Sequence, residues 1–231
     1  MPLYILYFIF FILIGVFLHL LRGYDLFTIS LIYVLLSTVL YFVDVFAVIY
    51  VIMFFAMAEG ITLIFNKKHE KRNYLNIIGN CLAAVIFLIV GFIFTNLGIL
   101  EFHLFVLASI VSINAAFADT FSSEIGKLSR IKPILITTFK TVEKGTSGGV
   151  TILGITAATF ASLISAIFFY IVGYQMIFII ILFICGILGS IIDSYIGATL
   201  ERNKIFNNNH TNFLATFLAG ALSILIYLIF V

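Results

Sequence analysis

Charged residues are scarce in this sequence. Asp, Glu, Lys and Arg together make up 10% of the 231 residues, whereas a soluble domain carries about 25%. A chain with so few charges cannot cover a surface that faces water. Hydrophobic residues make up 64% of the chain, and its mean hydropathy is +1.28. The composition therefore excludes a soluble globular protein and predicts an integral membrane protein.

Several residue patterns that mark common sites are also missing. The two cysteines, Cys81 and Cys185, lie within apolar runs and form no CxxC pair, so we expect small buried hydrophobes and not zinc or disulfide ligands. The chain contains no HxxH motif, no Ser-His-Asp arrangement, no carboxylate-rich metal cage and no GxxxxGK[ST] loop. A Walker A nucleotide site is therefore excluded.

Long apolar runs divide the chain into membrane spans. A spanning helix needs about 20 residues, and eight runs of about that length fit the sequence. A single helix over 26–65 would be roughly 60 Å long, twice the hydrocarbon thickness, so we expect a turn near Asp44. The predicted fold class is all-α, a polytopic transmembrane helical bundle. The expected spans are 2–21, 26–43, 45–65, 74–95, 99–118, 150–172, 175–199 and 212–230.

The basic residues give the predicted orientation of these spans. With eight spans, the loops after the first, third, fifth and seventh share one side, and they hold all twelve Lys and Arg residues. By the positive-inside rule this side is cytoplasmic and both termini lie outside. We expect one membrane domain over 1–231, with accessory spans in 1–65 and the motif-bearing part in 66–231. The basic residues are Arg22, Lys67, Lys68, Lys71, Arg72, Lys127, Arg130, Lys132, Lys140, Lys144, Arg202 and Lys204.

Acidic residues within spans are candidates for function, because a carboxylate at mid-bilayer costs roughly 2.5–3.5 kcal/mol. Asp119 and Asp193 lie near the same ends of two spans that run in the same direction, so both carboxylates are predicted to point into one pocket. Helical spacing puts Ser122, Ser123 and Gly126 on the face of Asp119, and it puts Gly197 and Glu201 on the face of Asp193. The alternative is that these acids only pair with lysines or hydroxyls and hold helices together.

Two further acids are weaker candidates. Glu124 follows Asp119 by five residues, which is about 140° round an ideal helix. It joins the face of Asp119 only if the helix breaks first. Glu59 has no second polar residue to support it, so it receives no role.

A glycine loop, residues 145–149 (GTSGG), leads into the span that begins at 150. Glycines allow close approach, and free amides at a helix N-terminus form a ready phosphate site. Lys140 and Lys144 are four residues apart and would point the same way on a helix or turn. The alternative is a plain turn beside cations that topology alone demands. The candidate phosphate-binding residues are Lys140, Lys144, Gly145, Thr146, Gly148 and Gly149.

Two smaller polar clusters lie on the same predicted side. Lys71 and Arg72 precede the fourth span, where Asn73, Asn76 and Asn80 share one helix face. A second cluster, 207–212 (NNNHTN), opens the eighth span. Amide side chains can bind a base, a sugar or a phosphate, although asparagine is also an ordinary loop and N-cap residue. His210 is interpreted as a loop residue. The candidate contacts to a nucleotide or phosphate in these clusters are Lys71, Arg72, Asn80, Asn209 and Asn212.

Several separated motifs resemble one family of integral membrane proteins. The motifs are ADTFSSEIG, ITTFKTVEKGTSGGVTILG, GSIIDSYIGATLE and NNNHTNF, in the order and spacing of that family, with KRNYLNIIGN similar to a further one. That family was long classed as of unknown function and includes the plant phytyl-phosphate kinase. The resemblance covers roughly residues 50–231. Glu201 stands where the family often has glutamine, and Phe121 stands where it often has tryptophan.

The first two motifs are also distantly similar to those of CTP-dependent dolichol and phytol kinases, which in turn resemble phosphatidate cytidylyltransferases. The resemblance implies phosphoryl transfer from a CTP-like nucleoside triphosphate to an isoprenyl monophosphate, such as phytyl or geranylgeranyl phosphate. Such an acceptor needs no strong general base, and the protein must instead place and neutralise two anions. On this interpretation Asp119, Asp193 and, more weakly, Glu124 bind Mg²⁺, while Lys140, Lys144 and the glycine-loop amides take phosphates.

Two alternative functions stay open at this point. A cation-coupled transporter would use the same aspartates for an ion path, but it predicts polar residues across the whole membrane depth, and here they gather at one face. A CTP:lipid-phosphate cytidylyltransferase shares the site and differs in which phosphorus is attacked. The expected partners are the nucleotide, the isoprenyl phosphate and the bilayer, and we expect no binding of nucleic acid. The sequence is compatible with a homo-oligomer. The expected location is a prokaryotic cell membrane, with the active site on the cytoplasmic side.

Overall fold

The fold is an all-α membrane bundle, as the sequence predicts. The computed structural model describes residues 15–16, 19, 23–65 and 74–230. One two-stranded antiparallel ribbon lies in the loop between the helices that end at Gly126 and begin at Ile152. The elements are α2 (Leu26–Phe42), α3 (Val45–Phe65), α4 (Tyr74–Asn96), α5 (Phe102–Gly126), β1 (Ile134–Leu135), β2 (Gly149–Val150), α6 (Ile152–Val172), α7 (Met176–Ile196), the π-helix η1 (Gly197–Glu201) and α8 (Asn208–Phe230).

Six helices in the described part of the chain, α3 to α8, are long and apolar enough to cross a membrane. α2 has 17 residues and is a shorter apolar helix. The predicted first span, 2–21, lies almost wholly outside the described residues, so the count of eight spans stays a prediction. The predicted turn between α2 and α3 is confirmed, because Asp44 follows the end of α2 and its Oδ1 accepts a hydrogen bond from the Ala47 amide at 2.7 Å.

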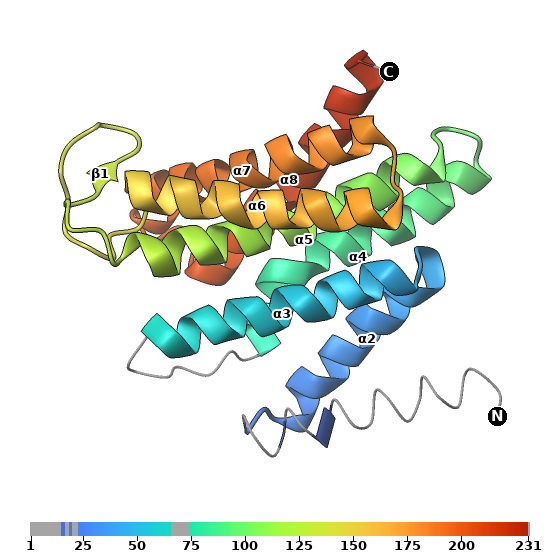
Figure 1. Ribbon diagram of the computed structural model, residues 1–231, viewed down its shortest axis with the longest axis horizontal. Helices are drawn as coiled ribbons and strands as arrows, with labels where there is room; N and C mark the ends of the chain where they lie inside the picture. Colours follow the sequence, from blue (N-terminus) through green and yellow to red (C-terminus); the bar gives the residue numbers. More distant parts are fainter. Residues whose placement is uncertain (1–14, 17–18, 20–22, 66–73, 231) are drawn as a thin grey trace.

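Helix α5 forms the centre of the bundle. In the most apolar 18-residue stretch of α5, 83% of the residues are buried inside the bundle. The buried share is 28% to 50% in the corresponding stretches of the other five spans. α4, α6, α7 and α8 all pack against it, and α3 joins them from the side (Figure 1). The helix is also longer than predicted, since it continues past 118 to Gly126. The segment that carries Asp119 and Glu124 is therefore helical throughout.

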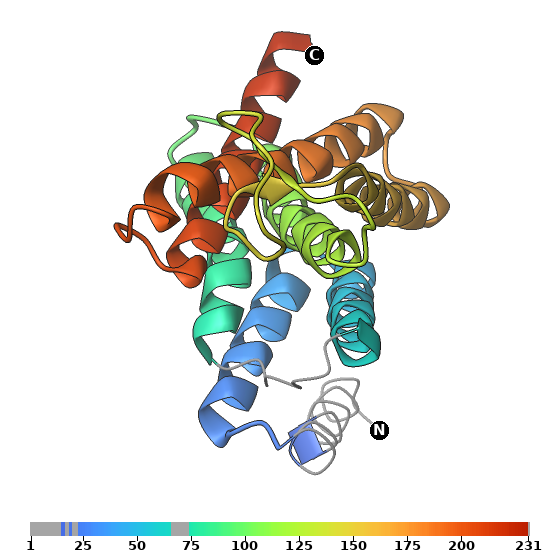
Figure 2. The same cartoon turned by 90° about the vertical axis from the view of Figure 1, so that its left-hand side faces the viewer.

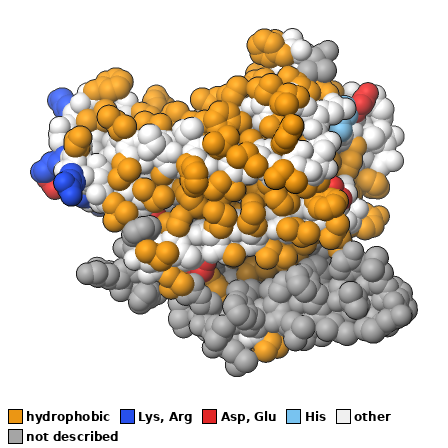
Figure 3. All heavy atoms as spheres, viewed as in Figure 1, with side chains coloured by type: hydrophobic (Ala, Val, Ile, Leu, Met, Phe, Trp, Pro, Cys, Tyr) orange, Lys and Arg blue, Asp and Glu red, His pale blue; other side chains and the backbone are white. Residues whose placement is uncertain are grey.

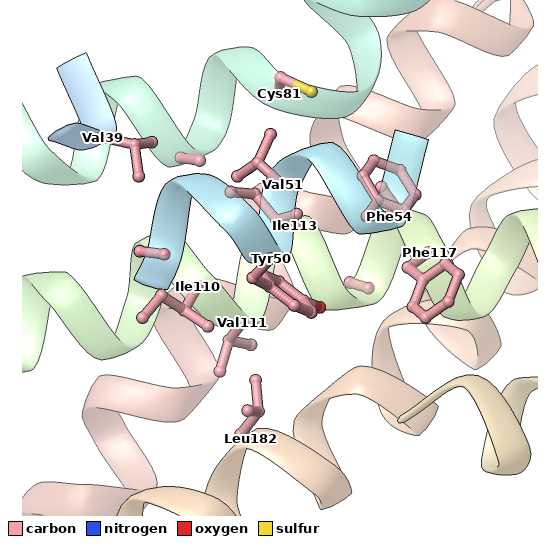
Figure 4. Close-up of a cluster of buried hydrophobic side chains, with 14 of the residues drawn as sticks. Val39, Tyr50, Val51, Phe54, Cys81, Ile110, Val111, Ile113, Phe117 and Leu182 are labelled. Carbon is pink, nitrogen blue, oxygen red and sulfur yellow. The ribbon is translucent and has the colours of Figure 1, made fainter. Parts of the chain in front are cut away.

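The apolar core joins the N-terminal helices to this bundle. Tyr50 and Phe54 of α3 are fully buried, and the Phe54 ring meets the Phe117 ring of α5 edge-on at 5.3 Å (Figure 4). Lipid is as apolar as these side chains, so close van der Waals packing and not escape from water stabilises such contacts in a bilayer. Cys81 and Cys185 are both buried and neither forms a disulfide, as predicted.

Close packing of α5 on α7 brings the two predicted aspartates together. A Cβ on Gly189 of α7 would overlap Cβ of Ala115 on α5, so only glycine permits this crossing. The two helices run in the same direction because only α6 separates them in the chain. Asp119 lies four residues beyond Ala115 and Asp193 lies four beyond Gly189, so both fall one turn further along the same side of the crossing.

The described basic residues gather at one end of the bundle, which we call the basic end. All seven lie in two loops, 127–149 and 202–207, and Figure 3 shows Lys and Arg atoms at that end only of the visible face. The loop 127–149 extends beyond the helix ends and crosses over them (Figure 2). At the opposite end the Tyr174 hydroxyl donates to Asp44 Oδ2 at 2.9 Å. Burial, with the Asp44 carboxylate second, raises the pKa of Tyr174. That the basic end is cytoplasmic stays a prediction.

Candidate functional site

A polar cavity of about 480 Å³ lies at the basic end. Helices α3, α4, α5, α7 and α8, η1 and the loop before α6 all contribute to its walls. The structure therefore brings together segments that are widely separated in the sequence. The predicted site residues that line the cavity are Asn80, Asp119, Glu124, Lys144, Gly145, Thr146, Gly148, Gly149, Asp193 and Asn212.

Four other predicted site residues are not placed there. Lys140 is exposed and does not line the cavity, and neither does Asn209. Lys71 and Arg72 lie outside the described residues, so their predicted role stays a prediction. Lys140 and Lys144 were expected to share a direction on a helix or turn, but the intervening chain is extended, with Thr141 bridging to Ile134. That geometry separates the two lysines, and only Lys144 reaches the cavity.

The two aspartates face the cavity from parallel helices. Asp119 Oδ1 accepts a hydrogen bond from Ser190 Oγ at 3.3 Å. The side-chain amide of Asn212 lies 3.2 Å from Asp193 Oδ2 and 3.0 Å from the amide oxygen of Asn80. Each carboxylate thus has one neutral partner and no paired cation among the described residues. Two such carboxylates in one cavity repel each other unless a cation lies between them.

The donors around the aspartates suit a hard divalent cation. Carboxylate, hydroxyl and amide oxygens line the cavity, and these are the oxygen ligands that Mg²⁺ takes. No group of three or more His, Cys, Asp or Glu side chains able to hold a metal ion occurs in the described part of the chain. Mg²⁺ does not require one, because it is usually bound through one or two carboxylates plus water and substrate phosphates.

Glu124 lines the cavity but is engaged elsewhere. The helix continues to Gly126 without the break that would turn Glu124 toward Asp119, and Glu124 Oε1 instead accepts from Lys127 Nζ at 3.0 Å. Lys132 is also engaged, since its Nζ donates to Glu143 Oε1 at 2.6 Å and thereby lowers the pKa of that carboxyl. The role of Glu124 as a metal ligand stays a prediction, and the pairing gives it another role.

Lys144 is the lysine best placed to meet an anion. Its Nζ donates to the backbone carbonyl of Lys127 at 3.2 Å, a neutral partner, so its charge is not cancelled by that contact. Lys127, the other lysine that lines the cavity, is paired with Glu124. Lys144 thus supplies the one cavity-lining ammonium without a carboxylate partner among the described residues.

The glycine loop differs from the predicted helix N-terminus. α6 begins only at Ile152, and its first turn is capped by the Thr151 hydroxyl, which accepts from the Gly154 amide at 3.0 Å. The loop is a separate turn in which the Gly149 amide donates to the Thr146 carbonyl at 2.9 Å. The Thr151 hydroxyl therefore satisfies one amide of this N-terminus, and the expected use of the helix amides for phosphate stays a prediction.

The loop nevertheless offers amides of its own. The backbone amides of Gly145, Ser147 and Gly148 make no hydrogen bond with another described residue, and all three residues line the cavity. Gly145 and Gly148 have φ of 84° and 77°, a left-handed conformation that glycine adopts without steric cost. Successive amides in such a turn form a concave anion site.

Two features of the site were not predicted. The Ser147 side chain was given no role from the sequence, but its Oγ donates to Glu201 Oε1 at 2.6 Å. The π-helix that carries Glu201 has no sequence signal that we recognise. π-turns occur frequently at functional sites, and this one lines the cavity through Gly197 and Glu201.

The asparagines mainly join two helices. Asn76 on α4 donates to Asn209 Oδ1 on α8 at 3.1 Å, and Asn80 lies beside Asn212. A Cβ on Gly79 would lie 2.9 Å from the Asn209 carbonyl oxygen, so the helices are in close contact. Asn80 and Asn212 line the cavity as predicted, whereas Asn209 holds α8 against α4.

A second polar cluster, in the middle of the bundle, was also missed. We call Tyr50, Asn114 and Ser165 the mid-bundle cluster. The Tyr50 hydroxyl lies 2.8 Å from Ser165 Oγ, which donates to Asn114 Oδ1 at 2.8 Å, and Asn114 Nδ2 donates to the Leu182 carbonyl at 2.9 Å. A lone asparagine within an apolar run was the available signal, since polar residues inside a span are rare.

Comparisons with known proteins agree with this architecture. Residues 9–220 match the family model described as integral membrane protein DUF92. The chain is 41% identical over 160 residues to an uncharacterized membrane protein of Methanocaldococcus jannaschii, covering 68% of this chain and 63% of that protein. It is 36% identical over 140 residues to Protein PGR of Arabidopsis thaliana, covering 46% of this chain and 49% of that protein.

A third relative is an uncharacterized membrane protein of a Synechocystis species, 33% identical over 120 residues, covering 51% of this chain and 46% of that protein. The chain thus spans about half to two thirds of the length of these curated relatives. No solved structure matches the chain. The family match extends over nearly the whole sequence and includes every cavity-lining segment described above. The chain therefore belongs to the family of integral membrane proteins described as DUF92.

Proposed function

We propose that this protein transfers the γ-phosphoryl group of a CTP-like nucleoside triphosphate to an isoprenyl monophosphate at the membrane surface. The observation that carries the proposal is the composition of the cavity. Two carboxylates, Asp119 and Asp193, line the same cavity as the glycine loop with its free amides and as Lys144, whose ammonium has no carboxylate partner among the described residues. Groups of opposite charge around one space of this size suit a phosphate that is bound together with a cation.

Each side of the cavity has a distinct task in this proposal. Asp119 and Asp193 hold Mg²⁺, which when bound supplies neutralisation of phosphate charge. Lys144 and the amides of Gly145, Ser147 and Gly148 hold the phosphate oxygens and orient the donor. The Asn212 amide, whose nitrogen donates to Asp193 Oδ2 at 3.2 Å, fixes the direction of that carboxylate. The acceptor phosphate is already ionised, so none of these residues has to remove a proton.

The mid-bundle cluster supports an enzyme over a transporter. A cation path would need polar groups free to meet an ion across the membrane depth. Tyr50, Asn114 and Ser165 are fully buried and bond one another and backbone carbonyls instead. The free polar groups on which the proposal rests lie at the basic end.

The decisive assay uses purified protein with phytyl or geranylgeranyl phosphate, Mg²⁺ and CTP labelled at either the γ- or the α-phosphorus. Transfer of γ-label to the lipid, giving the diphosphate, is expected. Transfer of α-label would instead identify a cytidylyltransferase, and transfer of neither label would refute nucleotide chemistry with these lipids. The Asp119→Asn variant is the control, since it keeps the shape of the side chain and removes its charge.

A further inference from the structure

The glycine loop is in direct contact with the π-turn, residues Gly197–Glu201. Ser147 Oγ donates to Glu201 Oε1 at 2.6 Å. A Cβ on Gly148 would overlap Ala198, and a Cβ on Gly197 would lie 3.1 Å from the Gly148 amide nitrogen. The two backbones are therefore packed together, and the side-chain hydrogen bond lies at the edge of this contact.

The π-turn explains how Glu201 reaches the loop. On an uninterrupted α-helix, Glu201 would lie about 80° round the axis from Asp193, eight residues earlier. A π-helix bonds each residue to the fifth one on, so each residue turns through a smaller angle. The Arg202 amide donates to the Gly197 carbonyl at 3.0 Å in this pattern. The wider turn reduces the offset, and both carboxylates line the same cavity.

The rest of the loop depends on few contacts. Its outer side is held by the short ribbon, in which Leu135 pairs with Gly149, and by the bond from the Ile136 amide to the Gly148 carbonyl at 3.1 Å. On the cavity side, the bond from Ser147 to Glu201 is the one side-chain hydrogen bond between residues 145–149 and a helix in the part of the chain that the structure describes. Loss of this bond removes the side-chain connection between the free amides of the loop and the helix that carries Asp193.

We infer that Ser147 and Glu201 are positioning residues, whose hydrogen bond holds the glycine loop on the π-turn with its free amides facing the two aspartates. This inference rests on the proposed function for its consequence, which is tight binding of the nucleotide phosphates. It assigns Glu201 a role different from that of Asp119 and Asp193. Glu201 acts as a hydrogen-bond acceptor, so a glutamine, whose Oε1 also accepts, can replace it.

The first test measures loop order without any substrate. Hydrogen exchange is followed in a peptide covering 143–150, which contains the internally bonded Thr146 and Gly149 amides. In Ser147→Ala and Glu201→Ala protein, exchange should be several-fold to about tenfold faster, as expected when a typical hydrogen bond is lost. In Glu201→Gln protein it should stay close to the parent rate. A peptide from the middle of α6 is the internal control and should not change.

Two outcomes would overturn the inference. Parent-like exchange in both alanine variants would show that the bond does not hold the loop. Equally fast exchange in Glu201→Gln and Glu201→Ala protein would show that the charge of Glu201, and not its acceptor oxygen, is what matters.

The second test measures the consequence for binding. The dissociation constant for CTP with Mg²⁺ should rise about tenfold in Ser147→Ala and Glu201→Ala protein and should change little in Glu201→Gln protein. Unchanged affinity in the alanine variants, with a loop that exchanges faster, would refute the positioning role. If the parent binds no CTP, the proposed function fails, and the exchange experiment still decides whether the bond holds the loop.

Discussion

The mid-bundle cluster and the cavity both place polar side chains inside this bundle, and their hydrogen bonding differs. In the mid-bundle cluster, Tyr50, Ser165 and Asn114 form one chain of bonds that ends on the Leu182 carbonyl, and all three side chains are fully buried. In the cavity, by contrast, the carboxylates of Asp119 and Asp193 have only neutral partners. The glycine loop beside them also keeps free amides.

This difference distinguishes polar side chains that stabilise the membrane bundle from polar side chains that are available to bind a ligand. Polar groups that satisfy one another can be buried among apolar helices and hold them in register. Charged groups that line an open cavity without a partner of opposite charge obtain such a partner only when a ligand binds. The predictions below therefore expect changes in the cavity to alter activity, and changes in the mid-bundle cluster to alter stability.

Removing one aspartate charge should have the largest effect. Asp119→Asn and Asp193→Asn keep the side-chain shape but lose a ligand charge, so turnover in the labelled-lipid assay should fall by about 10²–10³-fold, the usual loss when one preorganised charge-stabilising group is removed. Thermal unfolding in detergent should stay near that of the parent. Loss of thermal stability in parallel with activity would show instead that the acids only hold helices together.

The next largest effect is expected at Lys144, which could not be distinguished from Lys140 by sequence alone. Lys144→Gln should weaken CTP–Mg²⁺ binding by about 1.5–3 kcal/mol, the worth of a hydrogen bond to a charged group. Lys140→Gln is the matched control, because Lys140 is exposed and does not line the cavity. It should bind like the parent. Equal weakening by both substitutions in a calorimetric titration would contradict the placement of the loop.

In the mid-bundle cluster the expectation is reversed. Asn114→Ala removes the bonds to Ser165 and to the Leu182 carbonyl, and interhelical bonds of this kind are worth about 1–2 kcal/mol each at most. We expect a lower unfolding midpoint in detergent, with turnover per folded molecule unchanged. A variant that is as stable as the parent but inactive would place Asn114 in the functional site and remove the distinction between the two groups.

The smallest effect on turnover is expected for Asn212, which can be compared with Asn209 on the same helix, α8. Asn212→Ala loses the amide beside Asp193 and should lower turnover by a few-fold, in line with about 0.5–1.5 kcal/mol for a typical hydrogen bond. Asn209→Ala loses the bond from Asn76, and Asn209 itself does not line the cavity, so its turnover should equal that of the parent. Identical kinetics for the two variants would mean that Asn212 does not orient the carboxylate.

Much of the architecture followed from composition and periodicity alone. The apolar runs located α2 to α8 to within a few residues at most ends, because lipid demands continuous apolar helices and charge marks where they stop. The spacing of Asp119 and Asp193 also predicted their convergence. The exception was α5, which runs on through polar residues to Gly126, since these face a cavity and not lipid.

The sequence was less informative about contacts between distant segments. Ser147 and Glu201 are 54 residues apart, and their bond depends on a π-turn that no local pattern signals. The separation of Lys140 from Lys144 arises because the chain between them pairs with β1 and does not coil. One case depends on contact between the loop and the π-turn and the other on pairing within the loop, and helical spacing describes neither.

The central claim is that one phosphate is held on two sides, by the aspartates through a cation and by the amides of the glycine loop directly. Calorimetric titration of CTP into the purified parent and Asp119→Asn proteins, each with Mg²⁺ and with a chelator, tests it most directly. We expect binding by the parent with Mg²⁺ only, and a loss of affinity of about a hundredfold or more in the variant. Equal affinity with and without Mg²⁺, or equal affinity of the two proteins, would contradict the claim.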